Sequence, residues 1–325
     1  MSKVIRVVFS LVSMGNLQCV TQGSTPLMIA AENGHVQVVR MLIDNGANVD
    51  QQDEFGETAL MFASKSGHVN VGKILIDQGA LVDSQDSDGM TALMCASKNG
   101  HINIVKTLIE GSADLNLKDN EYFTGLIFAS KSGHVNVVRT LIDNGANVDE
   151  QDEVGKTALI WTSIYGHLDV VETLINNGTD VNLQDYDGGT ALSGASSHGH
   201  LDVVRTLIDK GATLDLQDCR DKTALMWASD RGHIYVVKTL IDNGADVNLQ
   251  AELGYTALMY ASQYGHLDVV KCLVEKGAKI ELMNEDCETA LTLASDNAHT
   301  DIIEYLMQNG TLNIDQDSIH KSNQV

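Results

Sequence analysis

Thr223-Ala-Leu-Met-Trp-Ala-Ser-Asp-Arg-Gly232 is one of nine near copies of a ten-residue pattern in this 325-residue chain. Thr256-Ala-Leu-Met-Tyr-Ala-Ser-Gln-Tyr-Gly265 is another. The opening threonine recurs every 33 residues without an insertion or a deletion, at Thr25, Thr58, Thr91, Thr124, Thr157, Thr190, Thr223, Thr256 and Thr289. A fixed period of this length predicts an array of small structural repeats and not a single globular core.

Each repeat carries the signals of two helices. The threonine is a good N-cap, and Pro26 suits the first helical position because its missing N–H would have no partner there. A Gly-His pair such as Gly34-His35 ends the first helix, since glycine tolerates the left-handed backbone of a sharp turn. In the second helix one apolar stripe is formed by Val38, Val39, Leu42 and Ile43. We therefore expect helix, tight turn, helix and loop in every repeat.

The whole repeat resembles the ankyrin repeat through Thr-Pro-Leu-Met-x-Ala, Gly-His, Val-Val, Leu-Ile and Gly-Ala-x-Val-Asp. The resemblance implies an all-α fold, an ankyrin-repeat solenoid of helix-turn-helix units joined by β-hairpin-like loops. It covers residues 21–312 as nine repeats. Residues 1–20 do not keep the register, so they are either a truncated cap or the remnant of a missing start, and residues 313–325 form a tail that begins an incomplete tenth unit.

One departure from the family pattern concerns the histidine that usually follows Thr-Pro-Leu. Other residues stand at that place in all nine repeats: Met28, Met61, Met94, Ile127, Ile160, Ser193, Met226, Met259 and Thr292. A hydrogen bond from that histidine to a neighbouring unit would therefore be absent, and we expect apolar packing in its place.

The first helix has a constant face and a variable face. Counting from the threonine at about 100° per residue, positions +2, +5 and +6 cluster toward the second helix, whereas +4, +7 and +8 point the other way. Position +4 holds very different side chains: Ile29, Phe62, Cys95, Phe128, Trp161, Gly194, Trp227, Tyr260 and Leu293. Such variation favours a surface shaped for a partner, although an aromatic side chain at +4 could also pack against its neighbour in the next repeat.

The variable face and the loop tips hold both tryptophans and most tyrosines of a chain that is only 5% aromatic. Tryptophan, tyrosine and arginine dominate the energetics of protein interfaces. The candidate partner-binding residues are Phe62, Lys65, Lys98, Phe128, Lys131, Trp161, Tyr165, Tyr186, Trp227, Arg231, Tyr255, Tyr260 and Tyr264.

Lys65, Lys98 and Lys131 occupy position +7 in three consecutive repeats. Adjacent helices lie roughly 8–10 Å apart, so the three side chains should form a basic row about 20 Å long. One interpretation is a solvated row without a partner. The other, which we adopt as a hypothesis, is that this row contacts an acidic segment of a partner protein.

The composition restricts the class of partner and the compartment. There are 21 basic and 44 acidic residues, and such an excess of negative charge argues against nucleic acid or a membrane surface as the partner. Five widely spaced cysteines without a Cys-x-x-Cys pair indicate reduced thiols in the cytoplasm or nucleus.

No motif of catalysis or metal binding stands out, and we expect no cofactor and no metal. Nine of the eleven histidines belong to the turns, one per repeat, and are too far apart to share a metal ion. Three loop asparagines, Asn116, Asn182 and Asn248, follow a Leu-x5-Asp pattern similar to that preferred by an asparaginyl hydroxylase that modifies ankyrin-like arrays. The alternative is that each asparagine only hydrogen-bonds its own backbone.

Two functions fit these observations. The first is a monomeric, non-catalytic scaffold or adaptor that binds a protein through the concave face and loop tips of the array. The second is an autoinhibitory or targeting arm of a larger multidomain protein, of which this chain is a fragment. An enzyme would need a convergent set of reactive side chains that the repeats do not supply.

Overall fold

A computed structural model describes residues 23–310, so the segments predicted before and after the array lie largely outside the described residues. The chain separates into two compact units. Among the described residues, the first comprises residues 23–158 and 172–179, and the second comprises residues 159–171 and 180–310. The boundary runs through the repeat that begins at Thr157.

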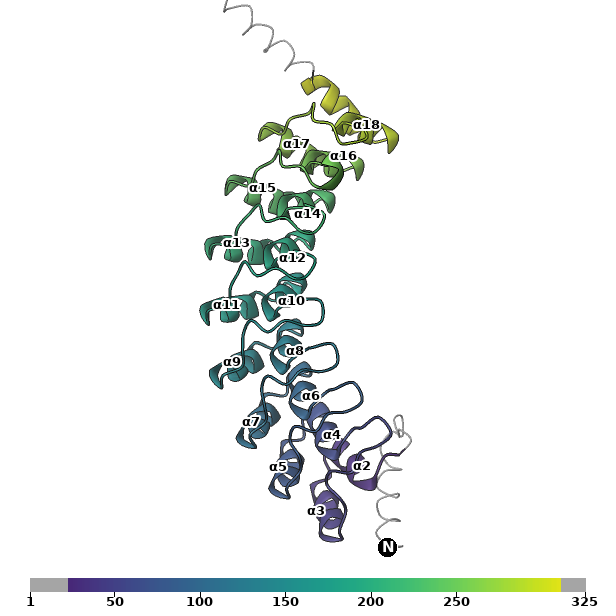
Figure 1. Cartoon of the computed structure of the whole chain (residues 1–325), viewed down its shortest axis with the longest axis vertical. Coiled ribbons are helices and arrows are strands. Elements are labelled where there is room, and N and C mark those ends of the chain that lie inside the picture. Colours follow the sequence, from purple (N-terminus) through teal and green to yellow (C-terminus); the bar gives the residue numbers. More distant parts are fainter. Residues whose placement is uncertain (1–22, 311–325) are drawn as a thin grey trace, which may run out of the picture. The chain divides into compact units, whose positions relative to one another are not determined.

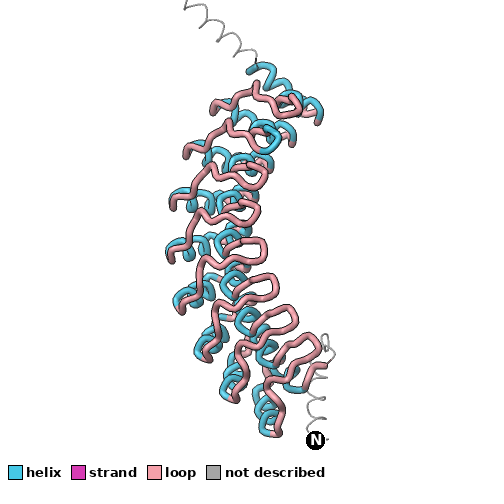
Figure 2. Tube along the Cα trace, in the orientation of Figure 1, coloured by secondary structure: helices cyan, strands magenta, loops and turns pink. Residues whose placement is uncertain are grey.

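Within residues 23–310 the regular structure is helical apart from one isolated bridge between Gln151 and Thr157, which confirms the predicted all-α class (Figure 2). The first unit contains α2 (Pro26–Glu32), α3 (Val36–Asp44), α4 (Ala59–Lys65), α5 (Val69–Asp77), α6 (Ala92–Lys98), α7 (Ile102–Glu110), α8 (Gly125–Lys131) and α9 (Val135–Asp143). At the boundary lie α10 (Ala158–Tyr165) and α11 (Leu168–Asn176).

The second unit repeats the same pattern. It contains α12 (Ala191–Ser197), α13 (Leu201–Asp209), α14 (Ala224–Asp230), α15 (Ile234–Asp242), the short 3-10 helix η1 (Glu252–Gly254), α16 (Ala257–Gln263), α17 (Leu267–Glu275) and α18 (Ala290–Asp296). Within each unit a first helix typically packs on the second helix of its own repeat and on the first helix of the next repeat, for example α4 on α5 and α6 (Figure 1).

The threonines cap the first helices as predicted, and the residue that replaces the usual histidine takes part in the cap. The Thr58 hydroxyl accepts a hydrogen bond from the Met61 backbone N–H. In return the Thr58 N–H donates to the Met61 sulfur at 3.4 Å. At Thr190 the acceptor is the Ser193 hydroxyl. Met61 is also fully buried, so apolar packing and a weak sulfur acceptor together occupy this position.

The Gly-His turn joins neighbouring repeats. Gly67 adopts a φ of 75°, and a side chain there would meet the His101 imidazole of the next repeat at 2.7 Å. His101 Nε2 lies 3.0 Å from the Lys65 carbonyl oxygen of the preceding repeat. Because a carbonyl can only accept, Nε2 carries the proton in this contact. The turn histidines are therefore structural, as the sequence indicated.

The core of each repeat lies between its two helices. Leu60 at position +2 and Leu75 of the second helix are both fully buried. Seven serines at position +6 are buried as well, and their hydroxyl groups make no hydrogen bond among the described residues: Ser64, Ser97, Ser130, Ser163, Ser196, Ser229 and Ser262.

Candidate functional site

Two grooves open on the face formed by the first helices and the loop tips, one in each unit. Groove A, in the first unit, has a volume of about 810 Å³ and is lined by Phe55, Glu57, Lys65, Asp86, Ser87, Asp88, Met90, Cys95, Lys98, Asn99, Asp119, Asn120, Glu121 and Phe128. Groove B, in the second unit, also has a volume of about 810 Å³ and is lined by Arg220, Lys222, Trp227, Asp230, Arg231, Glu252, Leu253, Tyr255, Tyr260, Gln263, Tyr264 and His266.

A buried lysine forms the floor of groove B. The Lys222 side chain is only 6% exposed, and its Nζ lies 2.6 Å from Asp230 Oδ2. The same ammonium lies 3.7 Å from the ring centroid of Trp227 and 4.1 Å from that of Tyr260. Burial lowers the pKa of Lys222, while the hydrogen bond to Asp230 raises it. The ammonium is thus held by one carboxylate and two aromatic faces.

The Trp227 ring is fixed from the loop that precedes α14. Its Nε1 donates a hydrogen bond to Asp218 Oδ2 at 2.9 Å. The Arg220 guanidinium lies over the same ring, with 5.2 Å between its central carbon and the ring centroid. A tryptophan held by a loop carboxylate and a stacked guanidinium presents a rigid apolar surface.

Two tyrosines continue the aromatic wall. The rings of Tyr255 and Tyr260 lie 5.3 Å apart between centroids. Burial raises the pKa of Tyr260 to about 12, and the charge of Asp230 adds to this shift. The hydroxyl of Tyr260 therefore stays protonated at neutral pH and can donate a hydrogen bond.

The rim of groove B is open to solvent. Tyr264 is 53% exposed and Leu253 is 52% exposed. Arg231, the C-cap residue of α14, is exposed as well. An aromatic ring, an aliphatic side chain and a guanidinium are thus available for contact above a buried floor.

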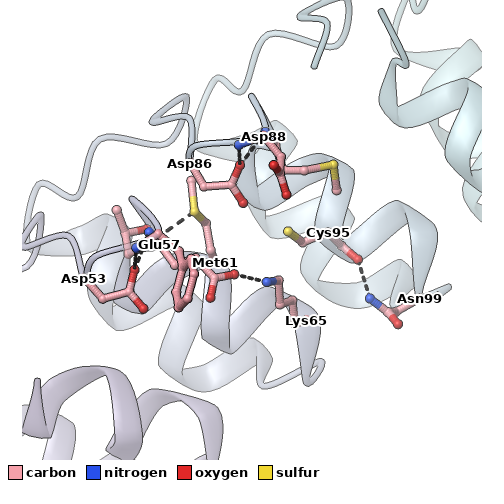
Figure 3. Close-up of polar contacts among 11 residues, drawn as sticks. Asp53, Glu57, Met61, Lys65, Asp86, Asp88, Cys95 and Asn99 are labelled. Carbon is pink, nitrogen blue, oxygen red and sulfur yellow. Dashed lines mark hydrogen bonds and ion pairs between the residues drawn. The ribbon is translucent and has the colours of Figure 1, made fainter. Parts of the chain in front are cut away.

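Groove A carries more acidic than basic residues, and each of the three lysines of the predicted basic row contacts a neighbouring side chain. Figure 3 shows the Lys65 ammonium directed at Glu57, with which it forms an ion pair. Lys98 Nζ lies over the Phe128 ring at 5.4 Å, and Lys131 Nζ lies over the Phe123 ring at 5.0 Å. Five carboxylates and two lysines line the groove, so it carries a formal excess of three negative charges. The predicted contact of the lysine row with an acidic segment stays a prediction, and this excess of negative charge disfavours it.

The predicted exposure of position +4 is wrong for several repeats. Phe62 is 8% exposed, and Cys95 and Leu293 are buried too. Two other repeats show how the preceding loop can cover position +4: its last residue (position −1) packs against that side chain, so that Phe123 contacts Phe128 and Tyr255 contacts Tyr260. A helical wheel includes the helix alone and cannot show this cover.

Five predicted residues line neither groove: Phe62 and Lys131, described above, and Trp161, Tyr165 and Tyr186. Trp161 stacks on Tyr165 with 6.1 Å between ring centroids, and Tyr165 is 48% exposed. Tyr186 stands at a loop tip and is 72% exposed. The last three of these lie in the second unit and remain candidates for partner contact.

The sequence analysis missed the loop residues that complete groove B. Arg220 and Lys222 stand at positions −3 and −1, whereas the variable face was defined by positions +4, +7 and +8 of the helix. Position −1 varies as widely as position +4, from Glu57 and Met90 to Lys222 and Tyr255. A comparison of the repeats that also included the three residues before the threonine would have identified this variable loop position.

The three loop asparagines bridge neighbouring repeats. Asn182 Oδ1 accepts a hydrogen bond from the Thr213 N–H at 2.8 Å, and Asn248 Oδ1 accepts one from the Lys279 N–H at 2.9 Å. Asn116 Oδ1 accepts in the same way from the Asn147 N–H. Their hydroxylation stays a prediction, which mass spectrometry of the protein from its native cell would test.

No group of three or more histidine, cysteine, aspartate or glutamate side chains in residues 23–310 is placed to hold a metal ion. In the same part of the chain no helix has the length and apolar character needed to cross a membrane.

The paired helices and the Gly-His turns define a repeat protein, and in each unit some of the variable residues line a groove. A family model described as ankyrin repeats (3 copies) matches residues 3–86, 27–119, 108–185, 177–251 and 225–318. The chain therefore belongs to the ankyrin-repeat family. A search of curated proteins returned no match. Ankyrin repeats are in general modules of protein–protein interaction.

Proposed function

We propose that the chain is a non-catalytic scaffold or adaptor that binds another protein through its first helices and loop tips. The observation that carries this proposal is the composition of groove B. Trp227, Tyr255, Tyr260, Tyr264 and Arg231 are of the residue types that supply most of the binding energy in protein interfaces, and here they line one groove. We further propose that the chain acts as a monomer, without a cofactor, in the cytoplasm or nucleus.

The rigidity of groove B supports this proposal. The Glu252 N–H donates to the Arg220 carbonyl oxygen at 2.9 Å, which joins two successive loop tips. The Gln217 side-chain amide donates to the Asp221 carbonyl oxygen within its own loop and to the Gln250 carbonyl oxygen of the next loop. Loops that are ordered before a partner arrives lower the entropic cost of association.

The proposal is tested with exposed residues whose loss leaves the core intact. The double variant Tyr264→Ala/Arg231→Ala removes two side chains from the rim of groove B. Loss of an interface hot spot weakens binding by roughly 30-fold or more, so the main partner captured from the native cell should be lost. Quantitative mass spectrometry of affinity-purified complexes measures this effect.

Tyr235→Ala is the matched control. Tyr235 is 70% exposed and lies on α15, a second helix, away from groove B. This variant should retain the partner. The proposed binding face would be rejected if the wild type, Tyr264→Ala/Arg231→Ala and Tyr235→Ala captured the same partners. Thermal unfolding must show that both variants are folded.

A further inference from the structure

We propose that groove B receives an acidic segment of the partner, with an aspartate or glutamate side chain bound between Arg220 and Arg231 and an apolar side chain packed beside it. The inference rests on the proposed function and specifies the chemistry of the partner. It also assigns the acidic segment of the partner to groove B, whereas the sequence predicted its binding at Lys65, Lys98 and Lys131.

Two guanidinium groups of groove B are available to a ligand. Both Arg220 and Arg231 are exposed, and neither forms an ion pair with a carboxylate within residues 23–310. Lys222, the third cation of the groove, is occupied by Asp230. Arginine recognises a carboxylate through two parallel hydrogen bonds, so each exposed guanidinium offers a strong site for an acidic side chain.

An apolar surface lines the same groove as the two arginines. The Arg220 guanidinium stacks on Trp227, and the exposed Leu253 and Tyr264 line the same groove. A partner segment that carried only acidic residues would leave this apolar surface in water. A segment that alternates acidic and apolar side chains would cover both.

Groove B differs in charge from the chain as a whole and from groove A. The chain has a formal net charge of −23, and groove A has five carboxylates against two lysines. In groove B the balance is reversed, with three basic residues against two acidic ones. Asp218 stands behind Trp227, where its carboxylate accepts the indole N–H. An acidic segment is therefore attracted to groove B and repelled from groove A.

Glu252 provides an internal check on this assignment. It is exposed, lines groove B and makes no side-chain hydrogen bond or ion pair within the described residues. Its negative charge opposes an acidic ligand. Replacing it with glutamine should therefore strengthen binding, whereas replacing either arginine should weaken it.

The loop geometry holds Arg220 in place before binding. Asp218 Oδ1 accepts hydrogen bonds from the backbone N–H groups of Arg220 and Lys222, both at 2.9 Å. Asp221 between them adopts a φ of 54°, a left-handed conformation that is uncommon for a residue with a side chain. These contacts fix the direction in which the Arg220 side chain leaves the loop.

The experiment selects ligands from a phage-displayed library of random dodecapeptides on the full chain. Peptides retained by the wild type are screened against Arg220→Gln/Arg231→Gln, and the binding of those that lose affinity is measured by calorimetry. We expect these peptides to be rich in aspartate or glutamate next to an aromatic or aliphatic residue. Each single arginine variant should weaken binding about tenfold, and Glu252→Gln should tighten it.

Arg205→Gln is the matched control, because it removes the same charge from α13 in the same unit. Arg205 lies near Asp202 on that second helix and does not line groove B. Selected peptides that depend on Arg220 and Arg231 but lack acidic residues would overturn the inference. So would selected peptides that bind all variants equally. In both cases the proposed function would stand if Tyr264→Ala/Arg231→Ala still lost its cellular partner.

Discussion

The contact between Lys222 and Asp230 gives the sharpest prediction about the second unit. Their side chains are 6% and 14% exposed, so both charges are largely removed from water. Removing one partner of a buried ion pair leaves the other charge uncompensated, which costs about 3–5 kcal/mol. Because Trp227 and Tyr260 still face the ammonium, we expect the lower end of this range, about 3 kcal/mol, for Asp230→Asn.

The double variant Lys222→Met/Asp230→Asn separates the interaction energy of the ion pair from the other contacts that each side chain makes. Methionine fills the space between the two aromatic rings without a charge, so the double variant should cost less than the sum of the single variants by about 2 kcal/mol. Urea unfolding followed by tryptophan fluorescence measures these differences. In a Trp161→Phe background the signal comes from Trp227, which is then the one tryptophan of the chain.

The first unit contains a pair of reversed polarity at the same two positions of the repeat, Glu57 and Lys65. The Lys65 side chain is 41% exposed, so solvent screening reduces the contribution of this pair to less than about 1 kcal/mol. The reasoning would be refuted if Asp230→Asn cost no more than Lys65→Met, or if the effects of Lys222→Met and Asp230→Asn were additive.

Three other predictions concern stability and thiol chemistry. Ser97→Ala should raise the free energy of unfolding by about 1 kcal/mol, because it removes a buried hydroxyl without a hydrogen bond, and chemical denaturation would show no gain if that hydroxyl were satisfied. Burial lowers the pKa of His200 below its usual 6.5, so the stability it contributes is present above pH 6.5 and is lost as the pH falls toward the folded-state pKa. In the variant His200→Gln the unfolding midpoint should therefore fall less steeply as the pH is lowered through that window. A pH dependence equal to that of the wild type would contradict this. Burial raises the pKa of Cys95 to about 11. At pH 8, N-ethylmaleimide should therefore label the exposed Cys219 rapidly and Cys95 only after unfolding. Equal labelling rates of the two thiols by mass spectrometry would contradict this, because they would show that Cys95 is accessible.

The fold could be predicted from the sequence because its signals are local and repeated. The N-cap at Thr58 and the turn at Gly67 depend on a few neighbouring residues, and each signal recurs at a fixed interval. The partner of the His101 imidazole could not be predicted, since it is a carbonyl 36 residues earlier in the chain. Contacts between repeats require the helices to be placed first.

The candidate site was predicted only in part, for a related reason. Counting around the helix placed Trp227 on the variable face, and Trp227 lines groove B. The same count placed Phe62 there, but the side chain is buried. It also presented Lys65 as a free cation, although Glu57 of the preceding loop pairs with it. The loop folds over the first helix, and no helical wheel contains the loop.

The central claim is that the partner contacts the first-helix face at groove B. The most direct measurement places the photo-crosslinking residue benzoylphenylalanine at Tyr264 or, as a control, at Tyr235 on the second-helix face, and irradiates the native cell. The account predicts that a partner protein is crosslinked through position 264 and not through position 235. Crosslinking of the same partner through position 235 alone, or equally through both positions, would contradict it.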